Sequence, residues 1–243
     1  MRRKLIILCV AAFLTIHVAF GQQANGQEAP LNPMQSAESA FDAFQATSNP
    51  TYSVAVVMRK DPHEVLAQFE SMICAGPSPR PCPSPLAYAA KAALEAGDRQ
   101  RARSYAIEAL QSAEAAASGW AKLGWTAPRS APGVPAADYY ANFVLGRLAI
   151  VDGDIRSAER YLLASGMTVG DSVARSLGPN MSLAFELLRR GDARSRQAVL
   201  QFLQEVKAFW NPSSGAIDNW SAQISAGETP VFRLGHGMPL LYH

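Results

Sequence analysis

The sequence predicts an all-α protein built from antiparallel helix hairpins, and three observations support this. Alanine supplies about one residue in six, which favours helix. Runs of β-branched residues that alternate with polar residues, as half-buried strands require, are essentially absent. A Gly-Asp pair separates two helical stretches at three places: Gly97-Asp98, Gly153-Asp154 and Gly191-Asp192. We therefore expect stacked hairpins followed by a short irregular C-terminal tail.

Each Gly-Asp pair suits the junction between two helices. Glycine can end the first helix in a left-handed conformation, and aspartate can cap the second by accepting its unpaired amide hydrogens. Apolar residues recur at matching distances, with Ala89, Leu145 and Leu183 each eight residues before a glycine. The glycines, at positions 97, 153 and 191, lie 56 and then 38 residues apart. The wider step predicts an insertion loop at about 118–135.

Two prolines predict helix starts. Asp61 precedes Pro62 and stands three residues before Glu64, which combines an N-cap, a first-turn proline and a capping-box acid. Ser84 before Pro85 predicts the next start in the same way. The sequence then predicts hairpins over 87–113 and 180–209, and a closing helix near 217–226.

The first 21 residues have the form of a secretory signal peptide. Three basic residues at positions 2–4 precede an apolar or neutral run from Leu5 to Phe20, and the small residues Ala19 and Gly21 suit a cleavage site. An uncleaved anchor helix is the alternative, but the run is short for a membrane span. We expect cleavage after Gly21 and export to the periplasm or the exterior of a bacterium, with no membrane span afterwards.

Cleavage would also change the charge. The whole chain has 22 Lys and Arg, 20 Asp and Glu, and a net charge of +2. Removing the three basic residues of the signal leaves 19 against 20, so the charge gives no reason to expect a nucleic-acid partner. The expected division is a signal peptide (1–21), a flexible lead-in (22–34), a helical-repeat domain (35–227) and a C-terminal tail (228–243).

Two cysteines remain after cleavage, Cys74 and Cys82. They flank a loop rich in proline, and an even pair in an oxidising compartment predicts a disulfide. A redox or metal pair is the alternative. The spacing is not Cys-x-x-Cys and no histidine lies near enough in sequence, so a structural disulfide is favoured.

The stretch around the central Gly-Asp pair resembles a tetratricopeptide repeat. The similarity extends from Asn142 through Gly153-Asp154 to Ala158, Tyr161 and Leu162. The pair Leu145-Gly146 and Ala158 fall where that repeat places its packing residues. The hairpins on either side depart from the pattern, with Ala89 and Ala90 in place of Leu and Gly in one, and Arg196 at a small-residue position in the other. The resemblance implies a right-handed array of about four helix pairs with a concave groove that binds protein or peptide.

A closer resemblance covers roughly residues 85–243. The chain resembles an uncharacterised group of exported bacterial helical-repeat proteins at Leu148 to Leu163, at Ser176 to Ala184 with its Gly-Pro-Asn-Met string, and at the later Phe209-Trp210 and Trp220. That group has no assigned activity, so the resemblance supports the architecture and leaves the function open.

The sequence contains no recognisable catalytic or cofactor motif. His63, His236 and His243 lack metal-ligand spacing, and no Gly-x-Ser-x-Gly elbow, phosphate-binding loop or dinucleotide fingerprint is present. We expect no catalytic, cofactor-binding or metal-binding residues, and a binding protein is favoured over an enzyme.

Two groups of residues are candidates for partner binding. The first helices of the hairpins would supply the groove, and the starts of the second helices would supply a basic rim for an acidic partner. The favoured alternative for the rim is ordinary solvated charge, balanced by Asp98, Asp154 and Asp192. The groove candidates are Tyr88, Tyr139, Asn142 and Arg147, and the rim candidates are Arg99, Arg101, Arg156, Arg194 and Arg196.

The insertion carries Trp120, Leu123 and Trp125, which could anchor a partner or, as we favour, fold back to seal a helical layer. Trp210 and Trp220 are expected in the core. The first functional hypothesis is an exported scaffold that binds a protein or peptide. The alternatives are an enzyme acting on envelope polymers, which a cluster of acids with shifted pKa values would favour, and a structural envelope component, which an apolar patch would favour.

Overall fold

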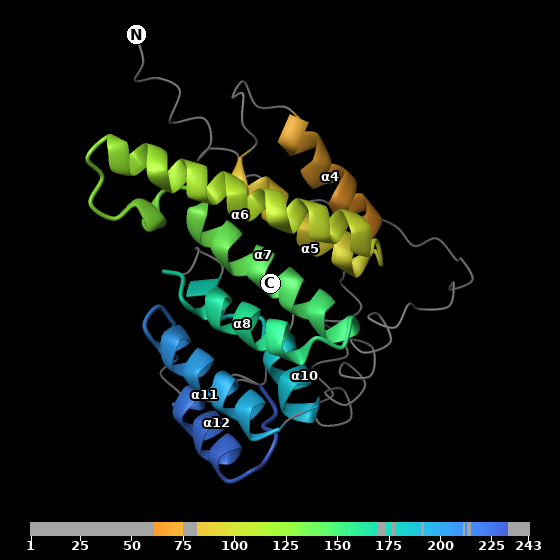
Figure 1. Cartoon of the computed structure of the whole chain (residues 1–243), viewed down its shortest axis with the longest axis vertical. Helices are drawn as coiled ribbons and strands as arrows, with labels where there is room; N and C mark the ends of the chain where they lie inside the picture. Colours follow the sequence, from red (N-terminus) through yellow and green to blue (C-terminus); the bar gives the residue numbers. More distant parts are fainter. Residues whose placement is uncertain are drawn as a thin grey trace. The chain divides into compact units, whose positions relative to one another are not determined.

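The computed structural model describes residues 61–74, 82–169, 174–175, 178–190, 192–210, 212 and 215–232, all within one compact unit that spans 32–243. Within these ranges the regular structure is eight α-helices and one short 3₁₀ helix, without a strand, which confirms the all-α class. The elements are α4 (Pro62–Cys74), α5 (Pro83–Glu95), α6 (Arg99–Lys122), η1 (Pro128–Ser130), α7 (Val134–Val151), α8 (Ile155–Gly166), α10 (Ser182–Arg190), α11 (Ala193–Lys207) and α12 (Ala216–Ser225), drawn in Figure 1.

Helices that follow one another in the chain pack together. Three helix pairs, α5/α6, α7/α8 and α10/α11, are each in contact across a Gly-Asp junction. The first helices also touch in succession, α5 with α7 and α7 with α10, while α8 packs against α11 among the second helices. Helix α4 packs on α5, and α12 packs on α11.

The Gly-Asp junctions have the predicted conformation at the two sites described in full. Gly97 and Gly153 have φ of 81° and 78°, a left-handed conformation that a side chain would disfavour. The amide of the following aspartate donates back to the ending helix, from Asp98 to Ala93 at 2.8 Å and from Asp154 to Ala149 at 2.9 Å. Each junction is therefore a Schellman motif, in which the same aspartate continues into the next helix.

The three aspartates also cap the second helices, as predicted. Their carboxylates accept from the amide three residues later, each at 2.9 Å. The donors are Arg101 for Asp98, Ser157 for Asp154 and Ser195 for Asp192. Gly191, which precedes the third aspartate, lies outside the described residues.

One predicted helix start is confirmed and one is wrong. The Asp61 carboxylate accepts from the His63 amide at 2.9 Å and caps α4. Helix α5, however, begins at Pro83, with Cys82 at its N-cap, so Ser84 lies inside the first turn. Pro83 suits the first helical position, because its fixed φ is helical and its missing amide hydrogen would be unpaired there, so the helix begins before Ser84. The Ser84 hydroxyl instead donates to the Gly133 carbonyl at 3.4 Å.

The insertion is shorter than predicted because both flanking helices extend into it. Helix α6 continues to Lys122 and α7 begins at Val134, which leaves 123–133 as the connection. The connection includes η1 and leads back onto the start of α7. The predicted loop of about 118–135 is corrected accordingly.

The turn that ends α6 brings the two tryptophans of the predicted insertion, Trp120 and Trp125, into contact. Gly124 has φ of 80°, and the Trp125 amide donates to the Trp120 carbonyl at 3.0 Å, which is again a Schellman motif. That motif is usually accompanied by an apolar contact between the same two positions. The indole rings of Trp120 and Trp125 meet it, with centroids 5.0 Å apart.

Helix α7 lies in the interior. It is buried on every side from Tyr139 to Ile150, as expected of a helix with apolar residues on every face, and Asn142 and Arg147 are buried with them. Gly146 permits this packing, since a Cβ at that position would collide with Leu183 of α10 and lie 3.3 Å from the Cβ of Tyr161. The Leu145-Gly146 pair therefore acts as a packing site between α7, α8 and α10.

Aromatic rings cover the C-terminal end of the described helices. Trp210 and Trp220 are buried and stack at 6.3 Å, and Phe232 meets Trp220 edge-on at 5.2 Å. Gly178 approaches the Trp210 ring so closely that a Cβ would lie 2.5 Å from it. The prediction that both tryptophans belong to the core is confirmed. The described part of the tail, 228–232, is irregular, and its Phe232 is buried.

Candidate functional site

Ion pairs join each helix pair to the next along the Gly-Asp junctions. Arginines near the starts of the second helices reach acids that belong to the neighbouring pair, far away in sequence. We call these contacts the arginine ladder. Its pairs are Arg101–Glu70 (α6 to α4, 3.1 Å), Arg103–Asp152 (α6 to the end of α7, 2.6 Å) and Arg156–Asp192 (α8 to the start of α11, 2.6 Å).

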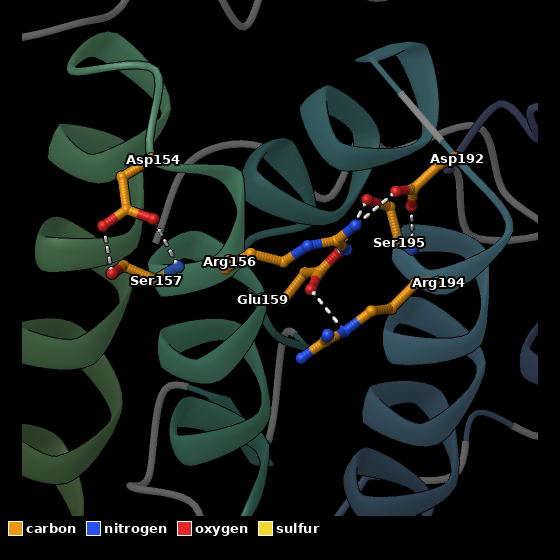
Figure 2. Close-up of polar contacts among 7 residues, drawn as sticks. All are labelled: Asp154, Arg156, Ser157, Glu159, Asp192, Arg194 and Ser195. Carbon is orange, nitrogen blue, oxygen red and sulfur yellow. Dashed lines mark hydrogen bonds and ion pairs between the residues drawn. The ribbon is translucent and has the colours of Figure 1, made fainter.

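Glu159 of α8 is a buried acid beside the Arg156–Asp192 pair, and it binds the same arginine. Only 3% of the residue is exposed, and its carboxylate accepts from Arg156 at 2.7 Å and from the Ser195 hydroxyl of α11 at 2.8 Å. The Nε of Arg194 lies 3.2 Å from the second oxygen, within ion-pair distance but without hydrogen-bond alignment. Figure 2 shows these side chains converging between α8 and α11. The cluster holds the second helices of two successive pairs together.

The ladder shifts the acid–base properties of its members. The Ser195 amide and then the Arg156 guanidinium lower the pKa of Asp192 from 3.8 to about 2. The hydroxyl and amide of Ser157 lower the pKa of Asp154, and the carboxylates of Glu159 and Asp192 raise the pKa of Arg156. Each shift favours the charged form, so the junctions stay ionised at neutral pH.

The rim candidates are mostly engaged inside the chain. Arg101, Arg156 and Arg194 take part in ion pairs, whereas Arg99 and Arg196 form no ion pair with any residue that the structure describes. The acids that engage the arginines include Glu70 and Glu159 beside the expected Asp98 and Asp192. Much of the predicted basic character is therefore neutralised locally.

The groove candidates lie mainly in the interior. Tyr139, Asn142 and Arg147 of α7 are buried, and Tyr88 of α5 is half-buried. The Tyr88 ring packs between Phe69 and Tyr140, with centroids 5.1 and 5.0 Å away. The expectation that Tyr139, Asn142 and Arg147 line an open groove is wrong, because α7 is buried there. For the half-buried Tyr88 it stays a prediction.

Two of these residues have structural contacts instead. The Tyr139 hydroxyl accepts from the Asn180 amide at 2.5 Å, and the Asn180 side chain accepts from the Ser182 amide at 2.9 Å at the start of α10. The Asn142 side chain donates to the Asp138 carbonyl at 2.6 Å within α7. The Gly-Pro-Asn-Met string is thus a buried turn held by Tyr139.

Sequence reasoning missed Glu159, Ser195 and Asp152. Arg156 and Glu159 stand three residues apart on one helix, a spacing that permits an ion pair. Nothing local, however, indicates that Glu159 is buried or that Ser195 meets it from another helix 36 residues away. Those contacts depend on how α8 and α11 pack.

Several sequence predictions fall outside what the structure describes. These are the signal peptide (1–21), the lead-in (22–34), the tail beyond Phe232, and the disulfide, since the loop 75–81 and the Cys74 side chain are not among the described residues. Within the described ranges, no group of three or more His, Cys, Asp or Glu is placed to hold a metal ion. No helix in those ranges has the length and apolar character to cross a membrane.

Comparison with other proteins identifies no relative. No family model matches the chain, no curated protein matches it, and no solved structure matches it.

Proposed function

We propose that the chain is an exported, tetratricopeptide-like array of helix hairpins that serves as a scaffold for a protein or peptide partner. The observation that supports this most directly is the stacking of the helix pairs: α5 touches α7, α7 touches α10, and α8 packs against α11. Contact of each pair with the next is what stacking of one repeated unit would produce. The step from such stacking to partner binding is an analogy at the level of the fold.

The second helices are the best candidate surface for the partner. The first helix α7 is buried, whereas α6, α8 and α11 each have an exposed polar face. Consecutive second helices are in contact at α8 and α11, so such a surface extends over more than one repeat. Exposed side chains on it include Glu108 and Gln111 of α6, Arg160 of α8, and Gln197 and Gln201 of α11.

Asp138, whose pKa is raised, and the nearby Glu114 do not resemble a catalytic pair of carboxylates. Burial raises the pKa of Asp138, the nearby Glu114 raises it further, and Arg129 between them lowers it. Arg129 forms ion pairs with both carboxylates and so fastens the 123–133 connection to α6 and α7. Carboxylates that share one arginine are engaged in structure, which favours the scaffold over the enzyme.

Site-specific photocrosslinking tests the proposal. A photoreactive amino acid at Gln111 or Gln197, in the full chain expressed in a bacterium, is expected to yield the same cross-linked partner from both positions. Ala222, exposed on α12 at the C-terminal end, is the matched control and is expected to yield none. Failure of both second-helix positions to cross-link, or an identical product from position 222, would contradict the proposal.

Export has its own test. Cell fractionation followed by N-terminal sequencing is expected to find the protein in the envelope or medium and beginning at Gln22. Intact mass with and without reductant checks the Cys74–Cys82 disulfide, which predicts a two-hydrogen mass increase on reduction. A cytoplasmic protein that retains Met1 or Arg2 would rule out the exported form.

A further inference from the structure

Large apolar side chains are exposed in two short segments of the chain. Leu123 and Trp125 follow α6 and are 80% and 47% exposed, while Met167 and Val169 follow α8 and are 72% and 45% exposed. In the part of the chain that the structure describes, Ile107 within α6 is the other large apolar residue exposed to this degree. We call these two segments the apolar tips: the first consists of Leu123 and Trp125, and the second of Met167 and Val169.

Both apolar tips lie at the same end of the helix pairs. The Arg103–Asp152 pair places the start of α6 beside the end of α7, so the end of α6 lies toward the start of α7. The Thr168 hydroxyl donates to the Pro135 carbonyl at 3.3 Å, which places the end of α8 at the start of α7 as well. Figure 1 shows the connection after α6 and the end of α8 on the same side of the view. The arginine ladder occupies the opposite end.

We propose that the apolar tips insert shallowly into the surface of a lipid bilayer. Residues 123–128 and 161–169 contain no charged side chain, and the next charge of the first connection, Arg129, is paired with Glu114 and Asp138. Trp and Leu are residues that partition into the interfacial region. Lys122, exposed and directly beside the first tip, is placed to meet anionic headgroups.

The extent of the tips favours a bilayer over a protein partner. Four partly exposed side chains on two separate turns offer roughly 300 Å² of apolar surface, whereas a stable protein interface buries about 800 Å² on each side. A few side chains suffice for weak, reversible attachment to a membrane, as a single acyl chain does. The Schellman motif at Gly124 fixes Leu123 and Trp125 in place, so little ordering is needed on insertion.

Quenching by brominated lipids tests this proposal locally. The full chain and its Trp125→Phe variant are mixed with vesicles of phosphatidylcholine and phosphatidylglycerol that carry bromine on the acyl chains. The difference between their emissions reports Trp125, which is expected to be quenched. Trp120, whose ring contacts Trp125, is present in both proteins, and the buried Trp210 and Trp220 act as internal references. This readout separates insertion of the tip from any attachment through the apolar segment at residues 5–20.

A charge at the tip is expected to abolish insertion. Leu123→Asp is expected to raise the lipid concentration needed for half-maximal quenching of Trp125 about tenfold or more. The reason is that Leu123 is exposed in the free protein and buries its apolar area only on insertion. Ile107→Asp is the matched control, because Ile107 is an exposed apolar residue within α6 and away from the tip that follows this helix, and it is expected to leave quenching unchanged. Circular dichroism checks that both variants are folded.

Three results would overturn the proposal: no quenching of Trp125, equal quenching with Leu123→Asp, or equal loss with Ile107→Asp. Self-association that depends on Leu123, seen by sedimentation velocity in the absence of lipid, would also overturn it by assigning the tips to a second copy of the chain. The proposal does not rest on the scaffold function, because the crosslinking positions on the second helices lie outside the tips. Either can fail without the other.

Discussion

The two ends of the helix pairs differ in chemistry although the same helices form both. At the junction end, Gly-Asp turns place charged groups close together, and these groups satisfy one another through the arginine ladder and Glu159. At the opposite end, the connections after α6 and α8 leave Leu123, Trp125 and Met167 in solvent. Charge that is neutralised internally has little left to offer a partner, whereas apolar surface in solvent has a free energy to gain from being covered.

The contrast shows that numbers of charged or apolar residues are poor guides to an interaction surface. The junction end is rich in arginine, yet Arg101, Arg156 and Arg194 are in ion pairs. The tip end has only a few apolar residues, and its Trp120–Trp125 contact leaves half of Trp125 exposed. Which groups remain unsatisfied after folding decides what a surface can bind.

The largest expected effect comes from Glu159→Ala at the junction end. The change leaves the buried Ser195 hydroxyl without its acceptor, while Arg156 and Arg194 can turn to solvent. We expect the free energy of unfolding to fall by roughly 2 kcal/mol, measured by urea denaturation. Glu159→Gln retains an acceptor oxygen and is expected to lose about half as much. Unchanged stability in Glu159→Ala would mean that the cluster does not hold α8 to α11.

A matched pair of glycine substitutions compares the two ends directly. Gly153 and Gly124 have φ of 78° and 80°, and a Cβ at either position would meet no atom within 4 Å. Alanine therefore introduces the same backbone penalty, about 1 kcal/mol, at both. We expect Gly153→Ala to lower the global free energy of unfolding by that amount. In Gly124→Ala the turn after α6 is expected to open locally, so that the global free energy of unfolding changes less. Hydrogen exchange near each site measures the difference, and identical global losses would refute it.

A smaller effect concerns proton binding by two aspartates, one at each end of the helix pairs. The pKa of Asp192 is about 2, lowered by the Ser195 amide and Arg156, so its stabilising contribution is complete above pH 4 and disappears as the pH falls through 2. Burial raises the pKa of Asp138, so its effect on stability has the opposite pH dependence. Its contribution is favourable in acid and disappears as the pH rises through the raised pKa. Carbon-13 titration by NMR is expected to find Asp138 protonating first.

Arg156→Gln is the variant that tests this assignment. It removes one of the two main causes of the low Asp192 pKa and keeps the Ser195 amide, so the Asp192 pKa is expected to rise part of the way toward 3.8. A value that does not move would show that Arg156 is not in contact with Asp192 in solution.

The smallest effect is expected at the tip end. Leu123→Ser removes a side chain that is 80% exposed, and its effect on the free energy of unfolding should lie within about 0.5 kcal/mol. The same denaturation measurement that detects Glu159→Ala checks this value. A loss above 1 kcal/mol would mean that Leu123 is buried in solution, and it would remove the contrast between the two ends.

The sequence predicted the features that depend on neighbours in the chain. Left-handed glycine, a capping aspartate and a Schellman motif involve residues within about five positions, and for this reason Gly97-Asp98 and Gly153-Asp154 could be recognised directly. The predicted cap at Ser84 was wrong because that residue's contact is with a residue far away in the sequence. Its hydroxyl is drawn to the Gly133 carbonyl, 49 residues away, and no local pattern reports that contact.

By itself, then, the sequence determined the helical class, the places where helices turn back and the caps at those turns, because each follows from short-range hydrogen bonding and backbone preference. Only the tertiary structure decided that α7 is buried, that Arg103 meets Asp152 and Arg156 meets Asp192, and that Leu123 and Trp125 stay exposed. These features depend on the register in which the helices stack. Close contacts such as that between Gly146 and Leu183 set this register across almost forty residues of chain.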